Sequence, residues 1–295
     1  MTNLGYEVVA IFGPTASGKS AVARRVSGAL GTEVVSADAL QVYRGLPILT
    51  NQAAEPTRLV AIRELADTMS VGEYATLAHA AIDDLVQGRG AAVVAGGTGL
   101  YLRAALADLE IPPAVEAARR EQLERLYDDS PDVAHALLVE LDPAAAGAVH
   151  PNDRRRVVRA LELAEAGTTL VPADGRLWST RTRRSSLIVG MEVPSDELGR
   201  RIADRTDDML RRGVVAEVHE ALRGPISHTA RKALGLDELA TLPIDEARER
   251  IAARTRRYAA YQRKWMRRIP GIVMIDANRP VEQVADAVLD LARAR

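Results

Sequence analysis

The chain has 295 residues, of which 47% are hydrophobic, and a formal net charge of −1. This length suits one large α/β domain with a smaller one. No apolar run approaches the roughly 18 residues of a membrane span, and the lack of cysteine excludes disulfides, thiolate zinc sites and cysteine nucleophiles. Since the N-terminal residues also lack a signal-peptide pattern, we expect a cytoplasmic protein that does not engage a membrane.

Short apolar runs flanked by glycine or polar residues predict buried strands, at 7–12, 32–36, 91–95, 187–193 and 272–275. Apolar residues at helical spacing predict helices between and after these strands, from about Gly18 to Gly31, at about 195–222 and 244–268, and at 281–292. Strands that alternate with helices are typical of a parallel sheet covered by helices on both faces. The sequence therefore predicts an α/β fold.

A purely helical region separates the third and fourth of these strands. Apolar residues recur at helical spacing over 114–127, 132–141 and 154–166. Asp142-Pro143 and the segment 150–153 carry turn and helix-cap signals, and the polar, arginine-rich residues 172–184 are expected to form a loop. We therefore expect a helical insertion lobe at 112–170, and a core made of 1–111 with 171–295.

The first strand runs directly into a phosphate-binding motif. Gly13-Pro14-Thr15-Ala16-Ser17-Gly18-Lys19-Ser20 matches the pattern G-x-x-x-x-G-K-[ST] between a strand and a helix, as a P-loop requires. Its backbone N–H groups and the helix N-terminus would hold phosphate oxygens. Lys19 would add positive charge, and Ser20 can ligate Mg²⁺. This motif predicts a P-loop NTPase-like sheet that binds a di- or triphosphate; the alternative is a glycine-rich turn without a ligand.

Two further segments follow strand ends and should share an edge of the sheet with the P-loop. Asp38 follows the second strand, where its carboxylate could be a general base, a group near Mg²⁺ or a helix cap. Gly96-Gly97-Thr98 follows the third strand, where an ordinary P-loop ATPase commonly has an acidic Mg²⁺ ligand. This indicates phosphate chemistry other than ordinary ATP hydrolysis, or else a tight strand-to-helix turn.

Basic residues are clustered although the net charge is nearly zero. Arg154, Arg155, Arg156 and Arg159 form one cluster, and a second runs from Arg248 to Arg268. Such clusters permit nucleic-acid binding but are equally typical of a solvated helix face. The five histidines show no metal-ligand spacing.

Taken in order, these motifs resemble the tRNA dimethylallyltransferase (tRNA isopentenyltransferase) family over about residues 7–275. The resemblance is carried by the P-loop, Asp38 to Gly45, Gly96 to Tyr101, His150 to Asp153, Arg156 to Glu162, Arg201 to Arg205, and Thr255 to Trp265. It implies transfer of a dimethylallyl group from its diphosphate to N6 of the adenosine 3′ of the anticodon in tRNA. It also implies that the target base leaves its stack.

The resemblance also implies residue roles. Asp38 matches the general base, Thr98 a residue beside the reacting centre, and Arg205 an arginine that neutralises the departing diphosphate. The P-loop, residues 13–20, would hold the diphosphate, with Mg²⁺ at Ser20. The anticodon stem-loop would contact a larger set of residues: Asp38, Ala39, Leu40, Gln41, Arg119, Arg155, Arg156, Arg159 and Lys232. We expect the protein to be a monomer.

This chain departs from the family pattern at several places: Ala39, Leu49 to Ala53, Thr57 to Ile62, Leu236, and Ala260-Tyr261. Two functions from other classes stay open on the sequence. One is a P-loop small-molecule kinase, with Asp38 as base toward a hydroxyl. The other is a non-catalytic RNA-binding P-loop protein.

Overall fold

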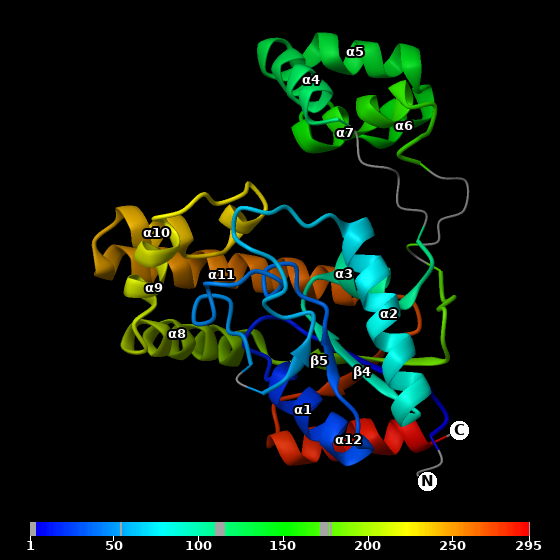
Figure 1. Ribbon diagram of the computed structural model, residues 1–295, viewed down its shortest axis with the longest axis vertical. Coiled ribbons are helices and arrows are strands. Elements are labelled where there is room, and N and C mark those ends of the chain that lie inside the picture. The colour runs from blue at the N-terminus through cyan, green and yellow to red at the C-terminus, as the bar shows by residue number, and fades with distance from the viewer. Residues whose placement is uncertain (1–3, 54, 110–115, 172–176, 178, 295) are drawn as a thin grey trace. The chain divides into compact units, whose positions relative to one another are not determined.

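The computed structural model describes residues 4–53, 55–109, 116–171, 177 and 179–294. The chain divides into two compact units. One, called the core unit here, comprises 1–109 and 177–295, and the other, called the lobe, comprises 110–176. Figure 1 shows the lobe as a separate group of helices that interrupts the core unit in the sequence.

A parallel sheet forms the centre of the core unit, with the strand order β3-β2-β4-β1-β5-β6. The strands are β1 (Val8–Phe12), β2 (Val34–Ser36), β3 (Thr57–Arg58), β4 (Ala92–Gly96), β5 (Ser186–Glu192) and β6 (Val273–Asp276). The predicted parallel sheet is confirmed, and β1 with its P-loop is an inner strand. The edge strand β3 was not predicted, because its two residues are polar and half-buried.

Helices cover both faces of this sheet, as predicted. Val9 and Ile11 of β1 belong to a buried cluster shared with helices α1 and α12. Successive strand residues point to opposite faces, and Val8, Ala10 and Phe12 are also fully buried. Helices α2 and α3 pack against β4 on that other side. The helices are α1 (Lys19–Leu30), α2 (Val71–Arg89), α3 (Gly99–Leu106) and α12 (Val281–Arg293).

Helix α2 is the longest element that the sequence analysis did not predict. Its start is encoded locally: the Ser70 hydroxyl accepts the Glu73 N–H, and the Glu73 carboxylate accepts the Ser70 N–H. This reciprocal capping satisfies two backbone donors that a helix N-terminus otherwise leaves free. The S-x-x-E pattern was therefore an available signal for this helix.

The C-terminal part of the core unit is broken into more helices than expected. The single helix expected over 195–222 is wrong, because the chain forms α8 (Ser195–Arg211) and α9 (Val214–Ala221). Gly213 between them has φ +90°, which glycine adopts at low cost and which ends a right-handed helix. The short helices η2 (Ala230–Lys232) and α10 (Leu236–Thr241) precede α11 (Ile244–Met266).

The described part of the lobe contains helices and no strand. The helices are α4 (Ala117–Asp129), α5 (Pro131–Leu141), α6 (Pro143–Ala148) and α7 (Arg154–Glu165). They enclose their own apolar cluster, which includes Leu123, Leu138 and Leu161. The cap signals were real, since the Asp142 side chain accepts Ala145 N–H and that of Asp153 accepts Arg156 N–H. Residues 114–115 of the predicted first helix, and 172–176 and 178 of the predicted loop, lie outside the described residues.

The two places where the chain leaves and re-enters the core unit are joined to each other. Arg103 of α3 is fully buried, and its guanidinium donates to the carbonyl oxygens of Leu177 (3.0 Å) and Ser179 (2.9 Å). The Arg183 N–H donates to the Leu106 carbonyl oxygen (2.8 Å), and the Arg183 side chain pairs with Asp108. These contacts form a clip at the root of the insertion.

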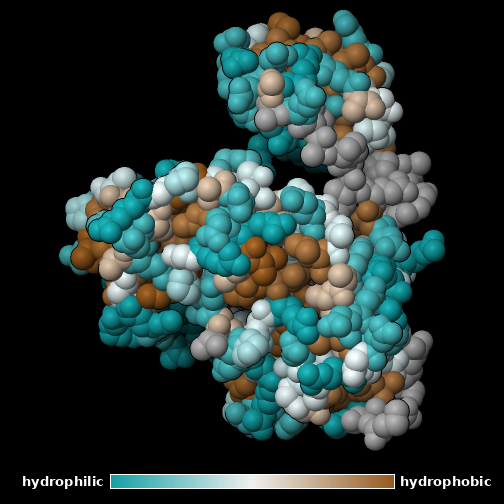
Figure 2. Space-filling model, in the orientation of Figure 1, coloured by the Kyte–Doolittle hydropathy of each residue, from teal (hydrophilic) through white to brown (hydrophobic). Residues whose placement is uncertain are grey.

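Across the part of the chain that the structure describes, no helix is long and apolar enough to cross a membrane. Figure 2 shows mostly hydrophilic side chains on the visible faces, with a compact apolar patch in the middle of the core unit.

Candidate active site

The P-loop has the backbone that its sequence requires. Gly18, the N-cap of α1, has φ +86°, and a Cβ at Gly13 would lie 2.6 Å from the Ser17 hydroxyl oxygen. The Lys19 ammonium donates to the carbonyl oxygen of Pro14 at 3.4 Å. Within the described chain the buried Ser17 hydroxyl has no hydrogen-bond partner. A buried polar group without a partner is costly unless a ligand satisfies it, so the loop is built to hold a polar ligand.

Asp38 and Thr98 lie side by side, at the ends of the neighbouring strands β2 and β4. The Ala39 N–H donates to the Thr98 hydroxyl oxygen at 3.5 Å. One carboxylate oxygen of Asp38 accepts the Leu40 N–H at 2.9 Å. Turns, and no helix, follow Asp38, so it closes a turn and the helix-cap interpretation is wrong. Its second carboxylate oxygen makes no hydrogen bond to the residues that the structure describes.

Gln262 of α11 connects the P-loop to the segment after β4. Its side-chain oxygen accepts the Thr15 N–H at 2.8 Å, and its amide nitrogen donates to the Gly97 carbonyl oxygen at 2.9 Å. A Cβ at Gly97 would lie 2.2 Å from that nitrogen. Gly97 is therefore required for this connection. No sequence motif predicts this role for Gln262, because its partners lie 247 and 165 residues away.

Two cations and one carboxylate determine the electrostatics of the site. Burial lowers the pKa of Lys19 to about 8. The nearby Asp38 carboxylate raises this pKa, and the Arg205 charge lowers it further, but both effects are smaller than that of burial. Burial also lowers the pKa of Arg205, again opposed by Asp38. The Arg205 guanidinium donates to the Thr15 hydroxyl at 2.8 Å. None of these three charged groups forms an ion pair with a described residue, so positive charge is in excess and favours an anion.

Tyr258 of α11 completes this polar wall. Burial and the nearby Asp38 charge raise the pKa of its hydroxyl to about 12, although Thr98 and Gln262 act in the opposite direction through hydrogen bonds. The Tyr258 hydroxyl therefore stays protonated at neutral pH and can only donate or accept a hydrogen bond there. It is a second site residue that the sequence analysis left without a role.

Most of these groups open onto one cleft of the core unit, whereas Thr98 and Ser17 lie behind its lining. Its polar lining comes from the P-loop, the turn after β2, and helices α8 and α11: Thr15, Lys19, Ser20, Asp38, Gln41, Thr50, Asn51, Arg205, Thr206, Thr255, Tyr258 and Gln262. Its apolar lining is Leu40, Leu49, Ile202, Met209, Ala233, Leu234 and Ile251. The cleft thus offers groups that suit a charged ligand together with apolar side chains that suit a hydrocarbon.

The residues predicted to contact RNA from the core unit differ in how available they are. Asp38, Leu40 and Gln41 line the cleft. The Gln41 side chain, however, accepts the Ser36 hydroxyl and donates to the carbonyl oxygens of Thr50 and Asn51. Lys232 is exposed in η2, directly before the cleft residue Ala233.

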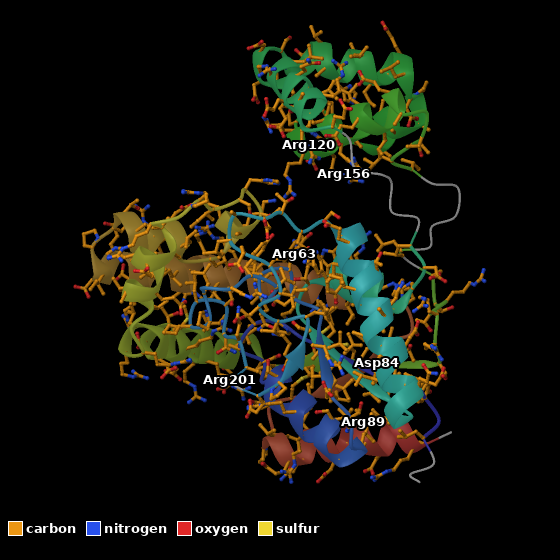
Figure 3. All side chains as sticks on the ribbon, in the orientation of Figure 1. Arg63, Asp84, Arg89, Arg120, Arg156 and Arg201 are labelled. Carbon is orange, nitrogen blue, oxygen red and sulfur yellow. The ribbon has the colours of Figure 1, made fainter. Side chains whose placement is uncertain are left out.

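The arginines predicted to contact RNA from the lobe fall into two kinds. Arg119 forms an ion pair with Glu165, and Arg159 forms one with Glu162, whose carboxylate is fully buried. Arg155 and Arg156 are exposed, and within the described residues neither forms an ion pair. Figure 3 labels Arg156 and Arg120 on the lobe; Arg120 also pairs with Glu162. Arg155 and Arg156 therefore keep the charge that a phosphate could use.

No three histidine, aspartate or glutamate side chains of the described residues gather as a metal site. Ser20, at the second position of α1, lines the cleft together with Lys19. This fits a Mg²⁺ ion that takes most of its ligands from a bound diphosphate and water, as Mg²⁺ usually does at phosphate sites.

The site combines a P-loop on an inner strand with excess positive charge and a carboxylate that has no cationic partner among the described residues. This combination defines an α/β protein that acts on an organic phosphate. The family model of the IPP transferases matches residues 41–269. This match covers most of the sequence, and the chain belongs to that family.

Curated relatives extend over nearly the whole chain. The tRNA dimethylallyltransferase of Kineococcus radiotolerans is 38% identical over 310 aligned residues, which cover 96% of each chain. That of Salinispora arenicola is 38% identical over 285 residues, covering 92% of this chain and 82% of the relative.

Solved structures agree with these relatives. The tRNA isopentenylpyrophosphate transferase of Bacillus halodurans superposes with a TM-score of 0.69 at 27% identity, covering 98% of this chain and 97% of that one. A eukaryotic dimethylallyltransferase, described as acting on tRNA, superposes with a TM-score of 0.79 at 26% identity, covering 98% and 80%.

Proposed function

We propose that the protein transfers a dimethylallyl group from dimethylallyl diphosphate to N6 of the adenosine 3′ of the anticodon in tRNA. The observation that supports this most is the meeting of Asp38, Lys19 and Arg205 in one cleft that is also partly apolar. The relatives named tRNA dimethylallyltransferase support the same reaction.

The chemistry assigns each group a task. The N6 amine attacks C1 of the dimethylallyl group, the bond between C1 and oxygen breaks, and diphosphate leaves with the bonding electrons. The Asp38 carboxylate takes the proton that N6 gives up, because an aromatic amine is a weak nucleophile until it loses that proton. Lys19, Arg205 and the P-loop N–H groups stabilise the charge on the leaving diphosphate. Thr98, beside Asp38, positions the turn that carries this base.

Mg²⁺ is the cofactor that we propose for this reaction, and Ser20 is its protein ligand. When bound, the ion supplies further positive charge to the diphosphate oxygens. Ser20→Ala should therefore weaken binding of inorganic diphosphate when Mg²⁺ is present and change it little in EDTA. Calorimetry under both conditions measures this difference, and equal losses would contradict the assignment of Ser20.

Residues of both units would hold the tRNA. Residues of the turn 38–41 line the cleft, so the target adenosine must leave its stack to reach Asp38. Arg155 and Arg156 carry exposed charge for phosphates of the anticodon stem-loop, with Lys232 as a further contact near the cleft. The cytoplasmic location and the monomeric state stay predictions from the sequence.

A direct assay tests the function. The protein is incubated with labelled dimethylallyl diphosphate and an unmodified anticodon stem-loop, and the RNA is then digested to nucleosides. We expect label on one adenosine, with none when that adenosine is replaced by guanosine. Phosphorylation of a small molecule without prenyl transfer would favour a kinase instead. RNA binding with no transfer would favour a non-catalytic RNA-binding protein.

A further inference from the structure

The apolar side of the cleft has a defined wall. Leu49, Met209 and Ile251 line the cleft and are 4%, 6% and 3% exposed. They also belong to one packed apolar cluster, built by the loop after Gly45 and helices α8, α9, α10 and α11. The wall is therefore the surface of a packed core, which deforms only at a cost.

Leu49 is held in place by its backbone. The Glu217 carboxylate of α9 accepts the N–H groups of Ile48 and Leu49, each at 2.8 Å. The Thr50 hydroxyl donates to the Leu46 carbonyl oxygen at 2.7 Å. Charge-assisted bonds of this kind are stronger than neutral ones. The Leu49 side chain therefore forms a fixed part of the wall.

Gly235 shows how tightly this wall is packed. A Cβ at Gly235, where φ is +102°, would lie 3.0 Å from one δ-methyl carbon of Leu49 and 3.2 Å from the δ-methyl carbon of Ile251. Both side chains thus meet at the same point of the backbone. A methyl group added there would force one of them to shift, so this part of the wall leaves little free space beside the Gly235 backbone.

From these contacts we propose that Leu49 and Ile251 form a stop that limits the allyl donor to five carbons. This proposal rests on the proposed prenyl transfer. With its diphosphate fixed at Lys19 and Arg205, a donor must lay its hydrocarbon along the remaining apolar lining. The proposal requires that a dimethylallyl tail end before the stop, whereas the five further carbons of a geranyl tail would meet Leu49 and Ile251. The bonds made and broken are the same for both donors.

The test compares the two donors with one acceptor, the unmodified anticodon stem-loop. For the wild-type protein we expect kcat/KM with geranyl diphosphate to be lower by roughly 100-fold or more, since a single methylene in an apolar pocket changes it by about 10–200-fold. Leu49→Ala should raise the geranyl rate and narrow the ratio at least tenfold. Ile251→Ala should act in the same direction.

Leu239→Ala is the matched control. Leu239 belongs to the same cluster and is 5% exposed, but it does not line the cleft. The Leu239→Ala variant should lose comparable stability, while its ratio of kcat/KM between the two donors should stay that of the wild type. If the alanine variants do not fold, Leu49→Val and Ile251→Val remove one carbon each and should shift the ratio several-fold.

The outcomes separate two failures. Dimethylallyl transfer with an unchanged ratio in the Leu49 and Ile251 variants would overturn the stop. An equal shift in Leu239→Ala would also overturn it, because general loosening would then explain the effect. If the wild-type protein transfers neither group, the proposed function itself is wrong.

Discussion

The core unit and the lobe use positive charge in opposite ways. In the cleft, burial lowers the pKa of Lys19 and Arg205, and no carboxylate of the described residues pairs with either. In the lobe, most charges are neutralised internally: Arg154 pairs with Asp128, and Arg120 and Arg159 converge on the buried Glu162. A basic cluster in a sequence therefore does not show which of its charges are available to a ligand.

The difference has a physical origin. A cation held in a partly desolvated cleft without a counter-ion is unfavourable until an anion arrives, so it favours ligand binding at the expense of the free protein. A cation paired with a neighbouring carboxylate has lost most of that potential and serves structure. Of the lobe arginines named for RNA contact, Arg119 and Arg159 are paired with carboxylates, and we expect Arg155 and Arg156, which form no ion pair with a described residue, to be the ones that contact RNA.

The largest expected effect concerns the only carboxylate among the three charged groups of the cleft. Asp38→Asn keeps the size of the side chain and its acceptance of the Leu40 N–H. It cannot accept a proton, so turnover should fall by about 10²–10⁴-fold. Single-turnover kinetics with saturating RNA measure this. RNA affinity and melting temperature are the controls and should barely change. A rate within a few-fold of wild type would make Asp38 structural.

Removing the buried carboxylate of the lobe should break its internal neutralisation. Glu162→Gln leaves Arg120 and Arg159 without their anion and should lower the free energy of unfolding of the lobe by about 1–3 kcal/mol. Hydrogen exchange should rise in α7 and not in α1. Glu121→Gln, which removes an exposed partner of Arg125, is the control and should cost less than about 1 kcal/mol. Equal effects would mean that the burial of Glu162 is unimportant.

The pKa of Lys19 predicts how diphosphate binding depends on pH. Because burial lowers this pKa to about 8, Lys19 is charged below pH 8 and loses its charge as pH rises through it. The affinity of the wild type relative to Lys19→Arg, which stays charged, should therefore decline above pH 8, by at most about tenfold per pH unit. Calorimetry with inorganic diphosphate from pH 7 to 9.5 measures both proteins. Parallel profiles would contradict a titrating Lys19.

The smallest effect should separate the free arginines of the lobe from the paired ones. Replacing Arg155 and Arg156 with alanine should flatten the dependence of log affinity for the stem-loop on log salt concentration by roughly 0.7–0.9 per arginine. Binding of diphosphate should not change. Arg154→Ala should flatten the slope less, since Arg154 is already paired with Asp128. If Arg154→Ala reduced the slope as much as each of the Arg155 and Arg156 replacements does, the ion pair with Asp128 would have no effect on RNA binding.

Sequence patterns predicted the parts of the fold that short segments encode. The P-loop, the inner strands and the caps at Asp142 and Asp153 depend on residues next to each other in the chain, and all are present. The break at Gly213 was missed because the apolar spacing continues across it. Helix α2 was missed although Ser70 and Glu73 mark its start.

The site could be predicted only where one motif carried it. Lys19, Ser20 and Asp38 follow strand ends, and the rule that ligands bind at this edge brings them together. Gln262, Tyr258 and Leu49 reach the cleft from distant elements, and their place depends on packing that no local pattern contains. Arg159 differs, because its partner Glu162 lies three residues further along the same helix, a spacing at which side chains pair; only the burial of Glu162 depends on packing.

The clip at the root of the insertion bears on how the protein folds. Arg103 bonds to Leu177 and Ser179, and Arg183 bonds to Leu106 and Asp108. These contacts join the two ends of the insertion, so for the core unit the lobe is equivalent to one long loop. The entropy lost on closing a loop grows only with the logarithm of its length, and each doubling costs about 0.6 kcal/mol. A short glycine-serine bridge in place of 110–176 should therefore leave the core unit able to fold and to bind diphosphate.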